Sequence, residues 1–162
     1  MTLVYLADLT HTTITVSSDS FPLGAGMVAA YARARFPDLR VEIFKYPGKL
    51  KKTIDREDPD VLAVSNYPWN LSLGSSFLGY VKRLRPETIT VMGGPNMSYE
   101  PSEQERFLRR YADCIDFYTL YEGETAFASL LEAAFAVEFD LAQLHEIGPE
   151  GTITLHEGKL NP

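Results

Sequence analysis

Glycine, proline and asparagine stand together at Gly93, Gly94, Pro95 and Asn96, at the end of an apolar run of strand length. Because glycine has no side chain, such a pair accepts positive φ values and lets a bulky ligand reach the main chain. A tight connection between a strand and a helix also calls for glycine, and for this pair alone the two interpretations are equally good.

A second group joins polar and aromatic side chains. Ser65 and Asn66 are followed by Tyr67 and Trp69 in the stretch SNYPWN. Upstream, residues 10–24 form a fifteen-residue segment rich in hydroxyl groups, whereas a connection from a strand to a helix usually has roughly two to six residues. We therefore expect the long segment to cover a ligand.

The third group is Glu122, Gly123 and Glu124. Two carboxylates this close could act as an acid and a base, but carboxylates near the start of a helix more often interact with its exposed amides, and we favour capping. No nucleophile or catalytic pair stands out, so no catalytic residue is predicted. Cys114 is the only cysteine, which excludes an internal disulfide and any zinc or iron–sulfur site built from several thiolates of this chain.

The elements that must position these groups alternate between strands and helices. Apolar runs of strand length occur at residues 3–9, 40–46, 61–67, 88–94 and 115–121. Segments with helical periodicity separate them, a rhythm typical of a parallel sheet covered on both faces. We predict an α/β fold: a doubly wound, flavodoxin-like or Rossmann-like sheet of five parallel strands. Ligands of such sheets bind outside the carboxyl ends of the strands, where the three groups fall.

Five helices are predicted, and the apolar spacing indicates their buried faces. In the first helix, apolar residues recur at spacings of three and four, which favours an apolar stripe, and its many small alanines would let it approach a sheet closely. The stripe is Leu23, Met27, Ala30, Tyr31 and Ala34. The fourth helix opens at Ser102, which matches a capping box with Glu105. The fifth has an apolar face made of Phe127, Leu130, Leu131 and Ala134. Beyond it the pattern weakens, and residues 150–162 indicate a small hairpin.

Composition narrows the class of protein. The 162 residues include 45% apolar and 23% charged residues, which is typical of one soluble globular domain. Fifteen basic against twenty-two acidic residues give a net charge of -7, so a broad nucleic-acid-binding surface is not expected. The sequence has neither a basic leader nor an apolar run of roughly 18 residues, so we expect no signal peptide or membrane span and a cytoplasmic location.

Two further ligand classes were weighed against these groups. The stretch GAGMVA at residues 24–29 matches a dinucleotide fingerprint, but the long segment separates it from the first strand, so nicotinamide-type binding ranks low. Flavin mononucleotide stays as an alternative, because Tyr67 and Trp69 could sandwich a ring and the hydroxyl groups could hold a phosphate. A ligand-free module that docks a partner domain with its sheet edge is the remaining alternative.

The ordered motifs resemble the N-terminal cobalamin-binding domain of cobalamin-dependent radical S-adenosylmethionine enzymes. The matching stretches are PLGAGMVAAYARARFP, PDVLAVSNY, VMGGPN and YEGETAFASLLEA, and together they cover most of residues 20–135. The resemblance implies a bound cobalamin whose nucleotide tail enters the sheet edge beside the glycine pair, with cobalt presented for methyl transfer or related radical chemistry. The cofactor-binding residues it implies are Leu23, Gly24, Ser65, Asn66, Tyr67, Trp69, Gly93, Gly94, Pro95, Asn96, Glu122, Gly123 and Glu124.

The sequence departs from related families in two respects. Cobalamin methyltransferases and mutases carry Asp-x-His-x-x-Gly in the first loop, whereas here Asp8 and His11 are three residues apart and no glycine follows. We therefore predict that no histidine of this chain binds cobalt. A radical enzyme also needs three closely spaced cysteines for its 4Fe–4S cluster, and Cys114 alone cannot supply them.

The resemblance also implies how the chain is divided. We expect residues 1–140 to form the cobalamin-binding domain and residues 141–162 to form a short hairpin or linker toward a radical S-adenosylmethionine domain, in the same parent chain or a separate one. The 4Fe–4S cluster and S-adenosylmethionine would be bound by that domain, so this chain alone is not expected to be catalytic.

Overall fold

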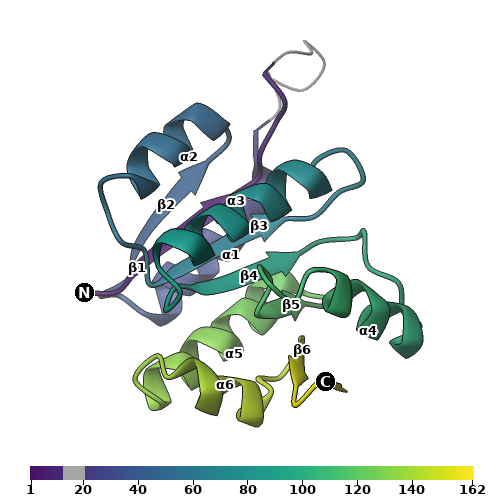
Figure 1. The fold of residues 1–162 in the computed structure, drawn as a ribbon. Coiled ribbons are helices and arrows are strands. Elements are labelled where there is room, and N and C mark those ends of the chain that lie inside the picture. Colours follow the sequence, from purple (N-terminus) through teal and green to yellow (C-terminus); the bar gives the residue numbers. More distant parts are fainter. Residues whose placement is uncertain (13–20) are drawn as a thin grey trace.

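The computed structural model describes residues 1–12 and 21–162, and its elements follow a βα order (Figure 1). The strands are β1 (Leu3–Ala7), β2 (Arg40–Phe44), β3 (Val61–Ser65), β4 (Ile89–Gly93), β5 (Phe117–Thr119), β6 (Thr152–His156) and β7 (Lys159–Asn161). The helices are α1 (Leu23–Arg35), α2 (Pro47–Ile54), α3 (Leu71–Leu84), α4 (Pro101–Arg110), α5 (Gly123–Ala136) and α6 (Leu141–Ile147).

All the strands of the described residues join one sheet in the order β2-β1-β3-β4-β5-β6-β7. Strands β1 to β5 pair in parallel, whereas β6 pairs antiparallel with β5 and β7 antiparallel with β6. The α/β class and the five parallel strands are confirmed. The strand count of the sheet was wrong, because the hairpin at residues 150–162 adds two strands to the same sheet instead of standing apart.

Helices cover both faces of the sheet. Figure 1 shows α3 in front of the strands and α1 behind them. Helices α2, α3 and α4 bury Leu50, Leu78 and Leu108 in one core, together with Tyr5 of β1. Helices α1, α5 and α6 pack on the opposite face, where Leu6 of β1 belongs to a second core. Adjacent residues of a strand point to opposite faces, so each buried strand serves both cores.

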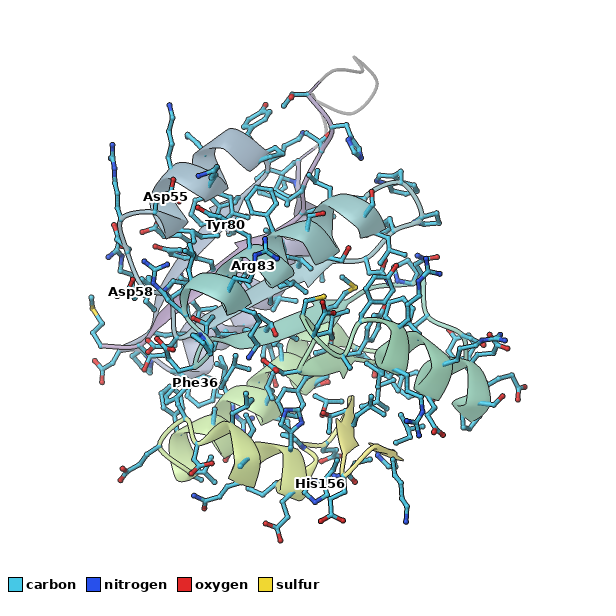
Figure 2. The ribbon with its side chains drawn as sticks, viewed as in Figure 1. Phe36, Asp55, Asp58, Tyr80, Arg83 and His156 are labelled. Atoms are coloured by element: carbon cyan, nitrogen blue, oxygen red, sulfur yellow. The ribbon has the colours of Figure 1, made fainter. Side chains whose placement is uncertain are left out.

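On the front face, α2 and α3 are also joined by a polar contact. Figure 2 shows Tyr80 of α3 close to Asp55 at the end of α2. The Tyr80 hydroxyl donates to Asp55 Oδ1 at 2.5 Å, and Lys51 Nζ lies 2.8 Å from Asp55 Oδ2. These exposed contacts add little to stability, so apolar burial against the sheet holds the two helices in place.

Helix α1 buries a different face from the one its large apolar residues indicated. Ala25, Ala29 and Ala32 are buried, whereas Leu23 and Met27 remain 62% and 51% exposed. The alanine face packs against α5 and the sheet, because small side chains allow a close approach between helix axes. The apolar stripe therefore points to solvent, and its first residue lies at the candidate site.

One local prediction was also wrong, and one helix was not predicted. Helix α4 begins after Glu100 with Pro101 at its first position, so Ser102 is already inside the helix and makes no capping bond. Helix α6 was not expected. Its N-cap residue is Asp140, whose side chain accepts from the Gln143 backbone amide at 3.0 Å. The buried face of α5 was predicted correctly.

The chain order creates a topological switch point between two strands. From β1 the chain passes through α1 behind the sheet to β2, whereas from β3 it passes through α3 in front of the sheet to β4. The connections therefore diverge beyond the carboxyl ends of β1 and β3. Such a divergence opens a crevice at that edge, where open α/β sheets bind ligands.

Candidate functional site

Strand register lines up one residue from each of three neighbouring strands at the carboxyl edge. Ser65 of β3 pairs with Gly93 of β4, and Gly93 pairs in turn with Thr119 of β5. The row therefore contains two hydroxyl groups with a glycine between them. Thr119 was not predicted as a site residue, although its position at the end of the fifth apolar run was a usable signal.

A pocket of about 180 Å³ opens over this row, between the sheet and the first turns of α1 and α5. It lies at the switch point, at the place the sequence pattern indicated. Seven predicted residues line it: Gly24, Ser65, Tyr67, Gly93, Gly94, Gly123 and Glu124. Residues that line it without having been predicted include Ala25, Val28, Thr119, Tyr121 and Phe127.

Two glycines at the pocket wall have no neighbour that requires them. A Cβ built at Gly24, in the first turn of α1, meets no atom within 4 Å. A Cβ at Gly123 would make only an ordinary contact with Val28, at 3.6 Å. Packing within the chain therefore does not explain these glycines. Their effect is to leave the space between α1 and α5 open.

The glycine pair at the end of β4, by contrast, has reasons within the protein. A Cβ at Gly93 would lie 2.1 Å from Thr119 Oγ1. Gly94 has a φ of 131°, and its Cβ would lie 2.7 Å from the carbonyl oxygen of Asn66. Close approach of the main chain thus demands glycine at position 94, whereas a side chain at position 93 would require the Thr119 hydroxyl to turn away. Since both also line the pocket, a structural role and a binding role coexist there.

Asn66 and Asn96, both predicted to bind a cofactor, brace the glycine connection instead of lining the pocket. Asn66 is fully buried and donates through Nδ2 to the Tyr118 hydroxyl at 3.0 Å. That hydroxyl donates to the Gly94 carbonyl at 2.8 Å, and Asn96 Nδ2 donates to Asn66 Oδ1 at 3.1 Å. Burial raises the pKa of Tyr118 to about 12, so its hydroxyl keeps the proton that it donates.

The two aromatic residues after β3 stack on each other. The rings of Tyr67 and Trp69 lie 4.7 Å apart at an interplanar angle of 7°. This distance leaves no space for a flavin ring between them, which removes one of the two observations that favoured a flavin. The other, the hydroxyl-rich segment, lies mostly outside the described residues. Trp69 is 63% exposed, and its carbonyl oxygen accepts a hydrogen bond from His11 Nε2 at 3.0 Å.

A buried amide that the sequence did not single out fixes this connection. Asn70 Oδ1 accepts from the Tyr67 backbone amide at 2.8 Å, and Asn70 Nδ2 lies 3.4 Å from both the Leu9 carbonyl and Asp8 Oδ1. Burial raises the pKa of Asp8, and Lys45 partly opposes this shift. Asn70 thereby joins the chain after β1 to the chain after β3, across the switch point.

The remaining predicted residues lie around the pocket mouth. Leu23 and Pro95 are exposed beside pocket residues. Glu122 is the N-cap residue of α5, but its side chain makes no capping hydrogen bond, so the capping interpretation was wrong for Glu122. Glu124 lies in the first turn of α5, where a carboxylate is favourable. Most of the segment expected to cover the ligand, residues 13–20, lies outside the described residues.

Burial keeps the thiol of the one cysteine in its unreactive form. Burial raises the pKa of Cys114 to about 11, so its thiol is protonated at neutral pH. Within residues 1–12 and 21–162, no three His, Cys, Asp or Glu side chains gather in a way that could hold a metal ion. None of the described helices is long and apolar enough to cross a membrane.

A comparison with protein families decides what kind of pocket this is. The B12 binding domain family matches residues 10–131. The chain belongs to this family. Most of the pocket lining lies within the matched residues, and Leu6 and Ala7 of β1 lie just before them. Cobalamin is confirmed as the cofactor class.

Relatives with curated functions carry such a domain within much longer chains. One is the 2-(S-pantetheinyl)-carbapenam-3-carboxylate methyltransferase of Streptantibioticus cattleyicolor, 34% identical over 115 residues. Another is the cobalamin-dependent radical SAM methyltransferase TokK of Streptomyces tokunonensis, 30% identical over 115 residues. Each match covers 68% of this chain and 16% of the relative's length.

A solved structure is also similar to this chain. It is a novel cobalamin-binding protein from Desulfitobacterium hafniense DCB-2, with 12% sequence identity and a TM-score of 0.49. The match covers 76% of this chain and 55% of that protein.

Proposed function

We propose that this B12-binding domain holds the nucleotide tail of cobalamin in the pocket between α1 and α5 and presents the cobalt to a radical S-adenosylmethionine domain for methyl transfer. The observation that carries the proposal is an open pocket at the switch point, with Gly24 and Gly123 in its wall although packing does not require them. The family match supplies the identity of the ligand.

The size of the pocket suits one end of a large ligand. Sites that enclose a whole drug-sized molecule have volumes of roughly 300–1,000 Å³, whereas this pocket measures about 180 Å³. It would therefore take the flat base of the tail, with the corrin ring outside, across the carboxyl ends of the strands. Ser65 and Thr119 would offer hydroxyl groups to the polar atoms of the tail.

Exposed apolar side chains beside the pocket provide a surface for the corrin. Leu23 and Trp69 are 62% and 63% exposed. The ring of Tyr67 stacks on the ring of Trp69. Large apolar side chains left in water at a site edge indicate a surface that is covered on binding. We infer that the Tyr67–Trp69 stack and Leu23 contact the corrin.

The role in methyl transfer rests on the curated relatives, both of which are methyltransferases. Cobalamin supplies a cobalt centre that can accept and donate a methyl group. The part of this chain is to bind the tail, orient the corrin and leave its outer face free for a partner. The iron–sulfur cluster and S-adenosylmethionine would be held by the partner domain, because the single cysteine here cannot hold a cluster. No histidine is proposed as a cobalt ligand.

Cobalamin binding can be tested with the purified chain and hydroxocobalamin. After desalting, the wild type should keep the pigment, and its visible spectrum should be that of cobalamin without a histidine ligand. Complete loss of the pigment would refute the proposal. Flavin mononucleotide treated in parallel should be removed by desalting, and retained yellow fluorescence would favour the flavin alternative.

A matched pair of variants locates the site. Gly24→Leu places a side chain in the pocket, and cobalamin affinity should fall by at least about tenfold. Gly48→Leu is the control, because Gly48 is also the second residue of a helix and its Cβ also meets no atom within 4 Å. Since α2 lies on the other face of the sheet, the Gly48 variant should bind like the wild type. Equal affinities for the two variants would place the tail elsewhere.

A further inference from the structure

Tyr121 adopts a backbone conformation that a bulky residue rarely accepts. Its φ is 52°, in the left-handed region that favours glycine and asparagine. The residue lies in the short connection between β5 and α5, two residues before the helix begins. A strained conformation persists only where the surrounding structure enforces it, and such positions gather at functional sites.

The position of Tyr121 in the molecule is what distinguishes it from the other strained residues. Glu138, Phe139 and Glu157 also have positive φ values, but they lie in turns that do not border the pocket. Tyr121 lines the tail pocket next to Gly123 and also borders a second cavity of about 490 Å³ between α1 and α5. With 77% of its surface exposed, the ring is not there to fill a core.

A second exposed tyrosine supports this ring. Tyr99, in the connection after β4, is 80% exposed. The rings of Tyr99 and Tyr121 lie 6.2 Å apart at an interplanar angle of 17°, which is a stacked arrangement. The connections after β4 and β5 thus form a stacked pair of rings, of which Tyr121 lines the pocket and Tyr99 lies behind it, outside the lining. Tyr121 follows β5 and Tyr67 follows β3, on either side of β4 and its glycine pair.

We propose that Tyr121, supported by Tyr99, forms an aromatic wall that recognises the base of the cobalamin tail and makes the domain select cobalamins over corrinoids without a nucleotide. This inference rests on the proposed function. A flat heteroaromatic base gains from stacking on an aromatic ring, whereas a corrinoid that lacks the base gains nothing there. The strained backbone holds the ring at the pocket, where a relaxed conformation would direct it elsewhere.

The test compares two ligands, hydroxocobalamin and cobinamide, which keeps the corrin but lacks the nucleotide tail. Tyr121→Asn removes the ring and supplies a residue that tolerates the left-handed region, so the fold should be as stable as the wild type or more stable. Cobalamin affinity should fall roughly 3- to 10-fold, the range expected for one aromatic stacking contact. Cobinamide affinity should not change. Tyr99→Ala should give a smaller loss in the same direction.

Glu138→Asn is the matched control, because it relieves the same backbone strain at a turn away from the pocket. It should leave both affinities unchanged. If Tyr121→Asn binds cobalamin like the wild type, or loses both ligands equally, the aromatic wall is refuted while cobalamin binding stands. If the wild type binds neither corrinoid, the proposed function fails and the inference falls with it.

Discussion

The two edges of the same sheet use polar and aromatic side chains in opposite ways. At the carboxyl edge, aromatic rings such as Trp69, Tyr99 and Tyr121 are exposed, and hydrogen bonds hold the main chain around an open pocket. At the amino edge, charged and polar side chains are buried and paired with one another. The difference teaches that one edge keeps a pocket open, whereas the other holds the sheet and the C-terminal hairpin together.

Asp116 is the centre of the amino edge. Its Oδ2 lies 2.6 Å from Lys82 Nζ and accepts from both the backbone amide and the hydroxyl of Thr90 at 2.7 Å. The carbonyl of Asp116 accepts from the Thr154 hydroxyl at 2.6 Å. Since that hydroxyl has donated its proton, His145 Nδ1 must be the donor in its 2.5 Å contact with Thr154 Oγ1. The cluster joins α3, β4, β6 and α6.

The largest expected effect comes from breaking this buried cluster. Asp116→Ala leaves the buried Lys82 ammonium without its counter-ion and the amide and hydroxyl of Thr90 without their acceptor. Loss of one member of a buried ion pair costs about 3–5 kcal/mol of unfolding free energy. Urea denaturation measures this loss. Asp58→Ala, which removes an exposed carboxylate paired with Arg85, should cost less than about 1 kcal/mol. Similar losses for the two variants would contradict the contrast between the edges.

Among glycine-to-alanine substitutions at the carboxyl edge, we expect Gly94→Ala to reduce the unfolding free energy most. The positive φ and the contact with the Asn66 carbonyl predict a loss of about 1–3 kcal/mol, together with weaker cobalamin binding. Gly24→Ala is the counterpart, because alanine favours the helix by about 0.5–1 kcal/mol and meets no neighbour. Thermal unfolding should therefore shift in opposite directions for the two variants, and a shift in the same direction would refute this account.

Tyr118 and Tyr5 are both buried, and replacing each with phenylalanine removes one hydroxyl group. The two losses of unfolding free energy can then be compared. Tyr118→Phe leaves the Gly94 carbonyl and the Asn66 amide without a partner and should cost about 1–3 kcal/mol. Tyr5→Phe loses only a 3.3 Å contact with the half-buried Glu57 and should cost less than about 1 kcal/mol. Cobalamin titration should show weaker binding for Tyr118→Phe alone. Unchanged binding would mean that Tyr118 stabilises the fold without shaping the pocket.

The smallest effect is a pH dependence at the amino edge. Burial lowers the pKa of His145, and Lys82 and His156 lower it further, although Asp116 opposes the shift. The unfolded chain then binds a proton at a higher pH than the folded chain. The His145 contribution is therefore complete above the unfolded pKa of roughly 6.5 and is lost as pH falls from there through the lower folded value.

Urea denaturation between pH 8 and pH 5 tests this dependence. His145→Gln should reduce the decline in unfolding free energy on acidification. His156→Gln retains His145 and should keep the decline. If the two variants lose stability with acid as steeply as the wild type, a group other than His145 controls the pH dependence.

Much of the fold and of the site location followed from local patterns. Apolar runs gave all five parallel strands, because a strand buried on both faces needs continuous apolar residues. The positions of Ser65 and Gly93 at strand ends placed the candidate site at the edge where the pocket lies. The hairpin at residues 150–162 was also visible, but its addition to the sheet through β5 depends on a pairing between distant residues that no local pattern contains.

The individual roles of the site residues were less predictable. Asn66 and Asn96 have the polarity of ligand-binding residues, yet their amides complete a network within the protein. The buried face of α1 was predicted from its largest apolar residues, whereas the close contact with α5 selected the alanines. Tyr121 was not predicted as a site residue, because neither its φ value nor its stacking on Tyr99 has a signature in the sequence.

The sequence by itself determined the order of strands and helices, the edge at which the pocket lies and the cofactor family, because each depends on motifs made of residues that lie close together along the chain. The tertiary structure decided which residues face the pocket and which brace it, and how charge is buried at the opposite edge. Those outcomes depend on distances between strand ends and helix faces, and such distances are set only when both cores are packed.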